Sequence, residues 1–199
     1  MALLFLLPQA GAPSELLDQV SRTYGRLDSF SADVEQISEN SSNQRVAQRG
    51  HVYLKKGNRA LFEYSEPYKS WEYFDGKTYT SYVEVKGQAN QYPMNQADSD
   101  LLAIIQVVGK RETPWKNQFR QFVEEPRQGN RVLLLTPKNK DLTSVEIEVD
   151  PKTFFIVRMV IAMADGRRNQ YRFTNIKTAP LADSLFKFVK PPGVELIKE

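Results

Sequence analysis

The sequence has 199 residues but no cysteine and only one histidine, His51. The lack of cysteine excludes disulfide bonds, thiolate metal sites, a cysteine nucleophile and lipid attachment to a cysteine of this chain. With only one histidine in addition, we expect no metal site, and we expect no other cofactor. His51 lies between Gly50 and Val52 with no aspartate or serine near it in sequence, so we interpret it as an ordinary strand histidine.

Catalytic motifs are also missing. The sequence has no GxSxG nucleophile elbow, no Walker A loop and no dinucleotide-binding fingerprint. Carboxylates such as Glu63 and Glu146 fall at outward positions of expected strands, where solvation explains them. The sequence alone leaves a hydrolase with paired carboxylates open, but no pair stands out, and we expect that the protein is not an enzyme.

A concentrated charge of one sign is absent too. The net charge is +3, and 27 basic residues are spread among 24 acidic ones. Nucleic-acid binding needs a localised basic patch, whereas only the short clusters 55–59 and 166–168 occur here. We therefore expect no nucleic-acid partner.

The one long apolar run is "MALLFLLPQAGA", residues 1–12. It is too short to cross a bilayer, which takes about 20 apolar residues. It resembles the apolar core and small-residue end of a secretory signal, although no Lys or Arg precedes it and Pro13 would follow a cut after Ala12. We interpret residues 1–12 as the remnant of a signal peptide, with a folded apolar tail as the alternative, and residues 14–199 as one domain.

Two segments have helical patterns. In residues 14–27 the apolar side chains recur on one side, and Ser14 can cap the helix. Residues 98–109, capped by Asp98 or Ser99 and ended by Gly109, are apolar almost all the way round, so this helix must be buried on every side. The second helix is therefore sandwiched or plugs something. The apolar residues of the two helical patterns include Leu17, Val20, Tyr24, Leu101, Leu102, Ile104, Ile105 and Val108.

Period-two alternation dominates the rest of the chain, and Asp75-Gly76 between aromatic runs is a strong hairpin signal. Residues 87–96 read as a loop. Short strands joined by hairpins predict a barrel or a strongly curved sheet. The expected strands are 29–36, 50–56, 59–64, 70–74, 77–85, 118–125, 130–137, 144–150, 154–163, 169–177 and 186–190.

The stretch from Thr153 to Met163 holds a single charge, Arg158. Arg158 alternates with small side chains, so we expect its set to face outward and the set with two methionines to face inward. Together the inward sets of the strands predict an apolar interior, which is either a packed core or a ligand cavity. The residues proposed to line it are Phe30, Val52, Leu54, Phe62, Tyr64, Tyr73, Tyr79, Val157, Met159, Ile161 and Met163.

The order of several motifs carries a family resemblance. The "DPKT" turn at 150–153 is followed by a strand, a "DG" turn, "YRFTNIK" at 171–177 and "LADSLFKFVKPPGVELI" at 181–197. Earlier, "FSADVEQ" precedes "GHVYLKKGNRALFEYSEPYKSWEYFDGKTYTSY" at 50–82. In order and spacing this combination resembles the periplasmic outer-membrane lipoprotein carrier family, LolA, over residues 14–199.

The resemblance implies an α+β, mostly β fold: an incomplete antiparallel barrel of about ten or eleven strands, with a helical lid over an apolar cavity. By the same resemblance, the helices predicted at 14–27 and 98–109 would form the lid. It implies a monomeric carrier in the periplasm of a Gram-negative-type envelope. The cargo would be acylated lipoproteins, received from an inner-membrane ABC transporter and passed to an outer-membrane receptor. The family also has a basic residue after the second strand that latches the lid from inside. Here that position reads Lys56-Gly57, so we expect the latch at Lys56 or else at Arg59.

Four alternatives stay open. The receptor of the same fold is normally anchored through a lipidated cysteine, and related lipoprotein-sensing or lipid-binding domains usually come with a second domain. A lipid or glycan hydrolase and a barrel without ligand are the others.

Overall fold

The computed structural model describes residues 15–97, 99–105, 115–127 and 129–199. The predicted signal remnant and Val108 lie outside these residues. The helices are α1 (Glu15–Arg26) and α2 (Ser99–Ile105), with 3₁₀ turns η1 (Glu84–Lys86), η2 (Met94–Gln96), η3 (Trp115–Gln118) and η4 (Asp183–Phe186). The strands are β1 (Ser29–Glu39), β2 (Arg45–Lys55), β3 (Arg59–Glu66), β4 (Ser70–Asp75), β5 (Thr78–Val83), β6 (Gln88–Pro93), β7 (Phe119–Arg127), β8 (Asn130–Pro137), β9 (Leu142–Val149), β10 (Ile156–Met163), β11 (Arg168–Lys177) and β12 (Glu195–Lys198).

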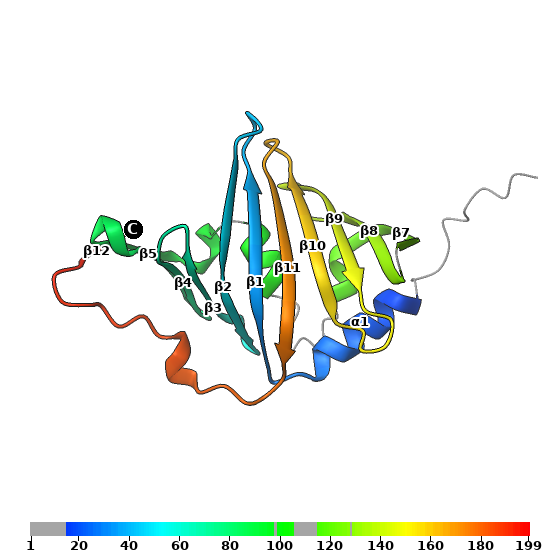
Figure 1. The fold of residues 1–199 in the computed structure, drawn as a ribbon, viewed down its shortest axis with the longest axis horizontal. Helices are drawn as coiled ribbons and strands as arrows, with labels where there is room; N and C mark the ends of the chain where they lie inside the picture. Colours follow the sequence, from blue (N-terminus) through cyan, green and yellow to red (C-terminus); the bar gives the residue numbers. More distant parts are fainter. Residues whose placement is uncertain (1–14, 98, 106–114, 128) are drawn as a thin grey trace, which may run out of the picture.

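All twelve strands form one curved sheet in the order β12-β6-β5-β4-β3-β2-β1-β11-β10-β9-β8-β7 (Figure 1). The long strands β1 and β11 join its two halves, with Val34 opposite Phe173. Neighbouring strands run antiparallel except β12, which pairs parallel with β6. Because β12 and β7 are the two ends of the order, the predicted incomplete barrel is confirmed.

The strand predictions failed in three places. Residues 186–190 are not a strand, because the chain crosses the sheet there after η4 without joining it. The predicted loop 87–96 instead contains β6, and β12 was not predicted at all. The sheet therefore has twelve strands.

The predicted hairpin at Asp75-Gly76 is confirmed between β4 and β5. The Asp75 carboxylate accepts the backbone N–H groups of Lys77 and Thr78 at 2.8 and 2.7 Å. Gly76 has φ +97°, a conformation that L side chains rarely adopt. Local turn chemistry thus fixes the register of this pair of strands.

The two helices cover the same face of the sheet, which we call the inner face. Helix α1 forms because its apolar residues recur at helical spacing, and it buries Leu16, Leu17, Val20 and Tyr24. From α2, Ile104 and Ile105 are buried in the same cluster. The predicted helical cover is therefore in place over an apolar interior.

A second, smaller cluster lies on the opposite, outer face. Trp71 stacks on Tyr82, with ring centroids 5.2 Å apart. The C-terminal segment, which runs along the outside of the sheet to β12 (Figure 1), adds Phe188, Val194 and Leu196. The sheet is thus apolar on both faces at β4 and β5.

Candidate functional site

The inner face brings together most of the residues predicted to line the interior. Eight of the predicted residues belong to the main apolar cluster, and Tyr79 is partly buried against it. In the cluster are Phe30, Val52, Leu54, Phe62, Tyr64, Met159, Ile161 and Met163. These side chains come from β1, β2, β3 and β10, strands far apart in sequence.

Two predicted members lie elsewhere. The register of β10 against β9 shifts between Ile156 and Arg158, so Val157 sits in a bulge and Ile156 joins the core in its place. Tyr73 packs on Phe188 of the outer cluster, with ring centroids 5.5 Å apart, because its neighbour Phe74 takes the inward position on β4. Both expectations were wrong.

Arg158 lies on the outer face as expected. Its guanidinium donates to Glu146 at 2.6 Å and to Gln170 at 2.9 Å. Strand β10 is therefore covered on its other face by an ion pair, and its remaining inward side chains belong to the interior.

The predicted cover residues divide into described and undescribed ones. Leu17, Val20 and Tyr24 of α1 are buried in the cluster, and Leu102 of α2 is partly buried against it. Ile104 and Ile105 of α2 are also buried in the cluster. The side chain of Leu101 and the whole of Val108 lie outside the described part of the structure.

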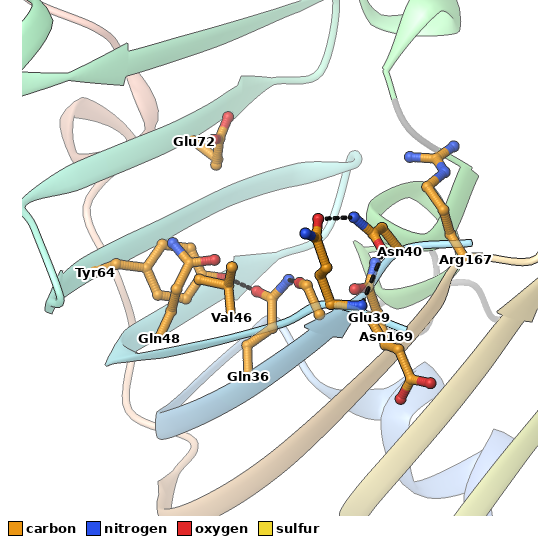
Figure 2. Close-up of a pocket in the computed structure, with 11 residues that line it drawn as sticks. Gln36, Glu39, Asn40, Val46, Gln48, Tyr64, Glu72, Arg167 and Asn169 are labelled. Carbon is orange, nitrogen blue, oxygen red and sulfur yellow. Dashed lines mark hydrogen bonds between the residues drawn. The ribbon is translucent and has the colours of Figure 1, made fainter. Parts of the chain in front are cut away.

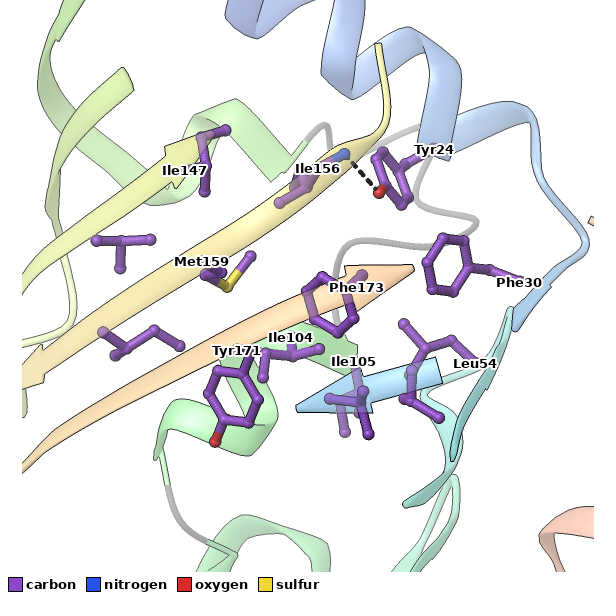
Figure 3. Packing of buried hydrophobic residues seen from close by; sticks show 14 of the residues in the cluster. Tyr24, Phe30, Leu54, Ile104, Ile105, Ile147, Ile156, Met159, Tyr171 and Phe173 are labelled. Atoms are coloured by element: carbon purple, nitrogen blue, oxygen red, sulfur yellow. Dashed lines mark hydrogen bonds between the residues drawn. The ribbon is translucent and has the colours of Figure 1, made fainter. Parts of the chain in front are cut away.

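Tyr24 ties α1 to the bulge of β10. Its hydroxyl accepts the backbone N–H of Ile156 at 3.0 Å, and burial raises the pKa of this hydroxyl well above its ordinary value (Figure 3). Tyr24 of α1 and Ile104 of α2 line a small hollow against the sheet, with a volume of about 10 Å³. That is hardly room for one water, so the two helices pack closely on the sheet at this point.

The predicted latch residues do not reach the interior. Lys56 is exposed and pairs with Asp28 at 2.6 Å, where it lowers the pKa of that carboxyl. Arg59 pairs with Asp183 at 2.6 Å. The inward parity of β2 ends with the strand at Lys55, because Gly57 turns the chain with φ +84°. The latch prediction at these two positions was wrong.

Beyond its apolar part, the inner face carries a polar pocket of about 330 Å³ (Figure 2). Its floor is Gln36, which accepts a hydrogen bond from the Tyr64 hydroxyl and donates to Ser38. Asn40 and Gln44 form the exposed rim at the β1–β2 turn. The pocket also includes Glu39, Val46, Gln48, Glu72, Arg167 and Asn169.

The histidine and the two carboxylates considered in the sequence analysis lie on the outer face. His51 pairs with Asp33 at 2.7 Å across β1 and β2, a contact that sequence proximity could not reveal. Glu63 accepts from the Trp71 indole at 3.2 Å, and Glu146 is held by Arg158. In the described part of the chain, acidic and histidine side chains gather nowhere in a group of three that could hold a metal ion.

Sequence reasoning missed several inward residues. Ile147 alternates cleanly with Glu146 and Glu148 on β9 and could have been added by parity. Tyr171 and Phe173 lie in the quoted "YRFTNIK" motif and share one inward face. Phe74 could be predicted only by knowing which face of β4 is inward, and Ile156 only by knowing of the bulge in β10. Alternation of side chains shows neither.

Comparison with known proteins decides the family. Residues 25–189 match the family model described as outer membrane lipoprotein carrier protein LolA. The chain belongs to the LolA family. An outer-membrane lipoprotein carrier protein of Pasteurella multocida is 26% identical over 205 residues, covering 98% of this chain and 93% of that protein. One of Actinobacillus succinogenes is also 26% identical, covering 92% and 88%.

The fold is also found among solved structures. An uncharacterized conserved protein from Thermus thermophilus aligns with a TM-score of 0.58 at 15% identity, covering 93% of this chain and 98% of that one. In the described part of this LolA family member, neither helix is long and apolar enough to cross a membrane.

Proposed function

We propose that this protein carries lipoproteins through the periplasm by binding their acyl chains on the inner face of its sheet. It would receive them from an inner-membrane ABC transporter and deliver them to an outer-membrane receptor, acting as a monomer without bond-making chemistry. Membership of a lipoprotein carrier family supports the general role. The observation that carries the proposal is an apolar sheet face covered by two helices instead of by further strands.

A cover of this kind can be displaced. The described part of helix α2 has seven residues, and isolated helices shorter than about 12–15 residues are marginal in water, so the order of α2 depends on packing. Burial of Ile104 and Ile105 contributes roughly 1.5–3 kcal/mol each.

An acyl chain of about 15 methylene groups gains roughly 12 kcal/mol when it is fully buried, at about 0.8 kcal/mol each. Because this exceeds the contribution of the two isoleucines, an acyl chain can replace α2 on the inner face. Transfer then runs toward whichever protein buries the same chains better.

Locking α2 onto the sheet tests the proposal. Leu54 and Ile104 line the same small hollow, and the chain has no other cysteine to interfere. A Leu54→Cys/Ile104→Cys variant, joined by a short bifunctional thiol reagent, should lose binding of a fluorescent diacylated lipopeptide at least tenfold. The unjoined variant should bind the lipopeptide one to one.

The matched control is a Ser144→Cys/Ala162→Cys variant, joined in the same way. These residues are paired neighbours on β9 and β10, on the face away from the helices. Its binding should equal that of the wild type. If the locked α2 variant binds as well as this control, or if wild-type protein binds no acylated probe, the proposal fails.

A further inference from the structure

Acyl-chain binding leaves half of the inner face unexplained. Along β1 the inward side chains are Phe30, Ala32 and Val34, and then Gln36 and Ser38. Tyr64 belongs to both parts: its ring lies in the apolar cluster and its hydroxyl bonds Gln36 on the pocket floor. The polar pocket therefore begins where the apolar interior ends.

The pocket is large enough for a ligand. Its volume of about 330 Å³ lies within the usual range of roughly 300–1,000 Å³ for ligand sites. Its floor is buried at Gln36 and Tyr64, whereas Asn40 and Gln44 at the rim are exposed. The pocket therefore runs from a buried floor to an exposed rim at the β1–β2 turn.

Carboxamides are the most frequent side chains lining the pocket, and they offer both hydrogen-bond donors and acceptors. They are Gln36, Asn40, Gln44, Gln48 and Asn169. Gln36 and Gln48 are direct neighbours across β1 and β2. Within the described residues, the Gln48 carboxamide has no hydrogen-bond partner, so its groups are available to a ligand.

Two of the three charged side chains in the pocket are held in ion pairs, and the third is held by a hydroxyl. Glu39 pairs with Arg45 at 2.9 Å, and Arg167 pairs with Asp165 at 2.7 Å. Glu72 accepts a hydrogen bond from Ser81 at 3.1 Å. The carboxamides, with their mixed donors and acceptors, suit an uncharged group that also both donates and accepts, and the peptide unit is such a group.

We propose that this pocket binds the peptide segment that directly follows the acylated residue of the cargo. The inference rests on the proposed function, because in a lipoprotein the polar group joined to the acyl chains is polypeptide. It assigns a direction to the cargo: acyl chains lie under α1 and α2, and the polypeptide leaves past Gln36 and Gln48 at the β1–β2 turn.

Three probes with identical acyl chains test the assignment. The first is a diacylated cysteine followed by four uncharged residues, the second is the diacylated cysteine alone, and the third carries a maltose head group. Wild-type protein should bind the first about tenfold more tightly than the second, equivalent to about 1.4 kcal/mol or one to two net hydrogen bonds. The maltose probe should bind like the second.

Removing the free carboxamide should remove this preference. In Gln48→Leu, and in Gln48→Ala in case leucine disturbs folding, the ratio of the two dissociation constants should fall from about ten to about two. Gln170→Leu is the matched control on the outer face, where Gln170 bonds Arg158, and should keep the wild-type ratio.

Each result decides. Equal affinity for the first two probes, or a ratio unchanged by both Gln48 variants, overturns the peptide site while the proposed function stands. Tight binding of the maltose probe that depends on Gln48 also overturns it, in favour of a sugar head group. Failure of all three probes to bind overturns the proposed function and this inference with it.

Discussion

The two apolar clusters of this sheet are closed by different means. The inner cluster is covered by α1 and α2, which lie on the sheet without joining it. The outer cluster is covered by the C-terminal segment, which is also bonded into the sheet through β12 and β6. A cover held mainly by side-chain packing can leave, whereas the backbone hydrogen bonds of a strand pair hold one that stays.

Polar contacts strengthen the difference. The Lys55 ammonium donates to the Leu181 carbonyl at 2.5 Å and pairs with Asp183 at 2.7 Å, which fastens the segment before Phe188. On the inner face the Tyr24 hydroxyl holds α1 to β10. Side-chain packing should therefore contribute more to the free energy of unfolding in the inner cluster than in the outer one. The outer cluster should depend more on the Lys55 contacts and on the pairing of β12 with β6.

Truncating one ring on each face should have the largest effect and measures this difference directly. Phe62 is fully buried against Phe74 and Tyr64, so Phe62→Ala should lower the free energy of unfolding by roughly 3–5 kcal/mol. Phe188 is only half-buried, so Phe188→Ala should cost roughly 1–2 kcal/mol. Urea unfolding of both variants gives the comparison. Equal losses would show that the two clusters contribute alike.

Alternation of side chains predicted most of this fold, and its failures have particular causes. In β10 the bulge at Val157 puts Ile156 in the core in place of Val157. The residues after the bulge keep the predicted alternation, so Met159, Ile161 and Met163 face inward. On β4 both faces are apolar, so nothing in the sequence distinguishes Tyr73 from Phe74 by polarity. In both cases tertiary contacts decide what local pattern leaves open.

The strands at one edge were harder to predict for another reason. In β6 only Ala89 is buried, and the strand ends at Pro93, which resembles a loop by composition. Strand β12 has four residues and exists because β6 offers it an edge. Phe186 and Phe188 are spaced like inward residues of a strand, but Phe186 ends the 3₁₀ turn η4 and Phe188 packs on the outer cluster.

The polar pocket was not predicted either. Gln36 and Gln48 occupy inward positions, but polar residues near the end of a hairpin usually mark its exposed tip. Only the curvature of the sheet turns them toward Tyr64 and Glu72 on neighbouring strands. Sequence alternation assigns a face and does not show how far a sheet curls over it.

A smaller change tests the fastening of α1. Tyr24→Phe removes the hydroxyl that accepts the buried Ile156 N–H, and an unpaired buried group costs about 1–3 kcal/mol. Tyr68→Phe is the control, because Tyr68 is 42% exposed, and it should change the free energy of unfolding by less than about 0.5 kcal/mol. If Tyr24→Phe is as mild as the control, the hydroxyl is not what holds α1 to the bulge.

The smallest expected effect on stability comes from the ion pair between Lys55 and Asp183, which holds the C-terminal segment, and it depends on pH. A hydrogen bond from Lys55, together with the nearby Arg59 charge, lowers the pKa of Asp183 below its ordinary value. The unfolded state then binds a proton more readily than the folded state, so the pair stabilises the fold above about pH 4. That contribution disappears as pH falls through the lowered pKa.

Asp183→Asn isolates this contribution, since it removes the charge at every pH and keeps the shape of the side chain. The wild type should be slightly more stable than the variant at pH 7, and the difference should vanish at about pH 2. The side chain of Asp183 is 63% exposed, so screening by 1 M salt should shrink the difference at pH 7 as well. A difference that is the same at both pH values would mean that the carboxylate charge does not fasten the segment, leaving β12 and the Lys55 bond to Leu181 to hold the outer cover.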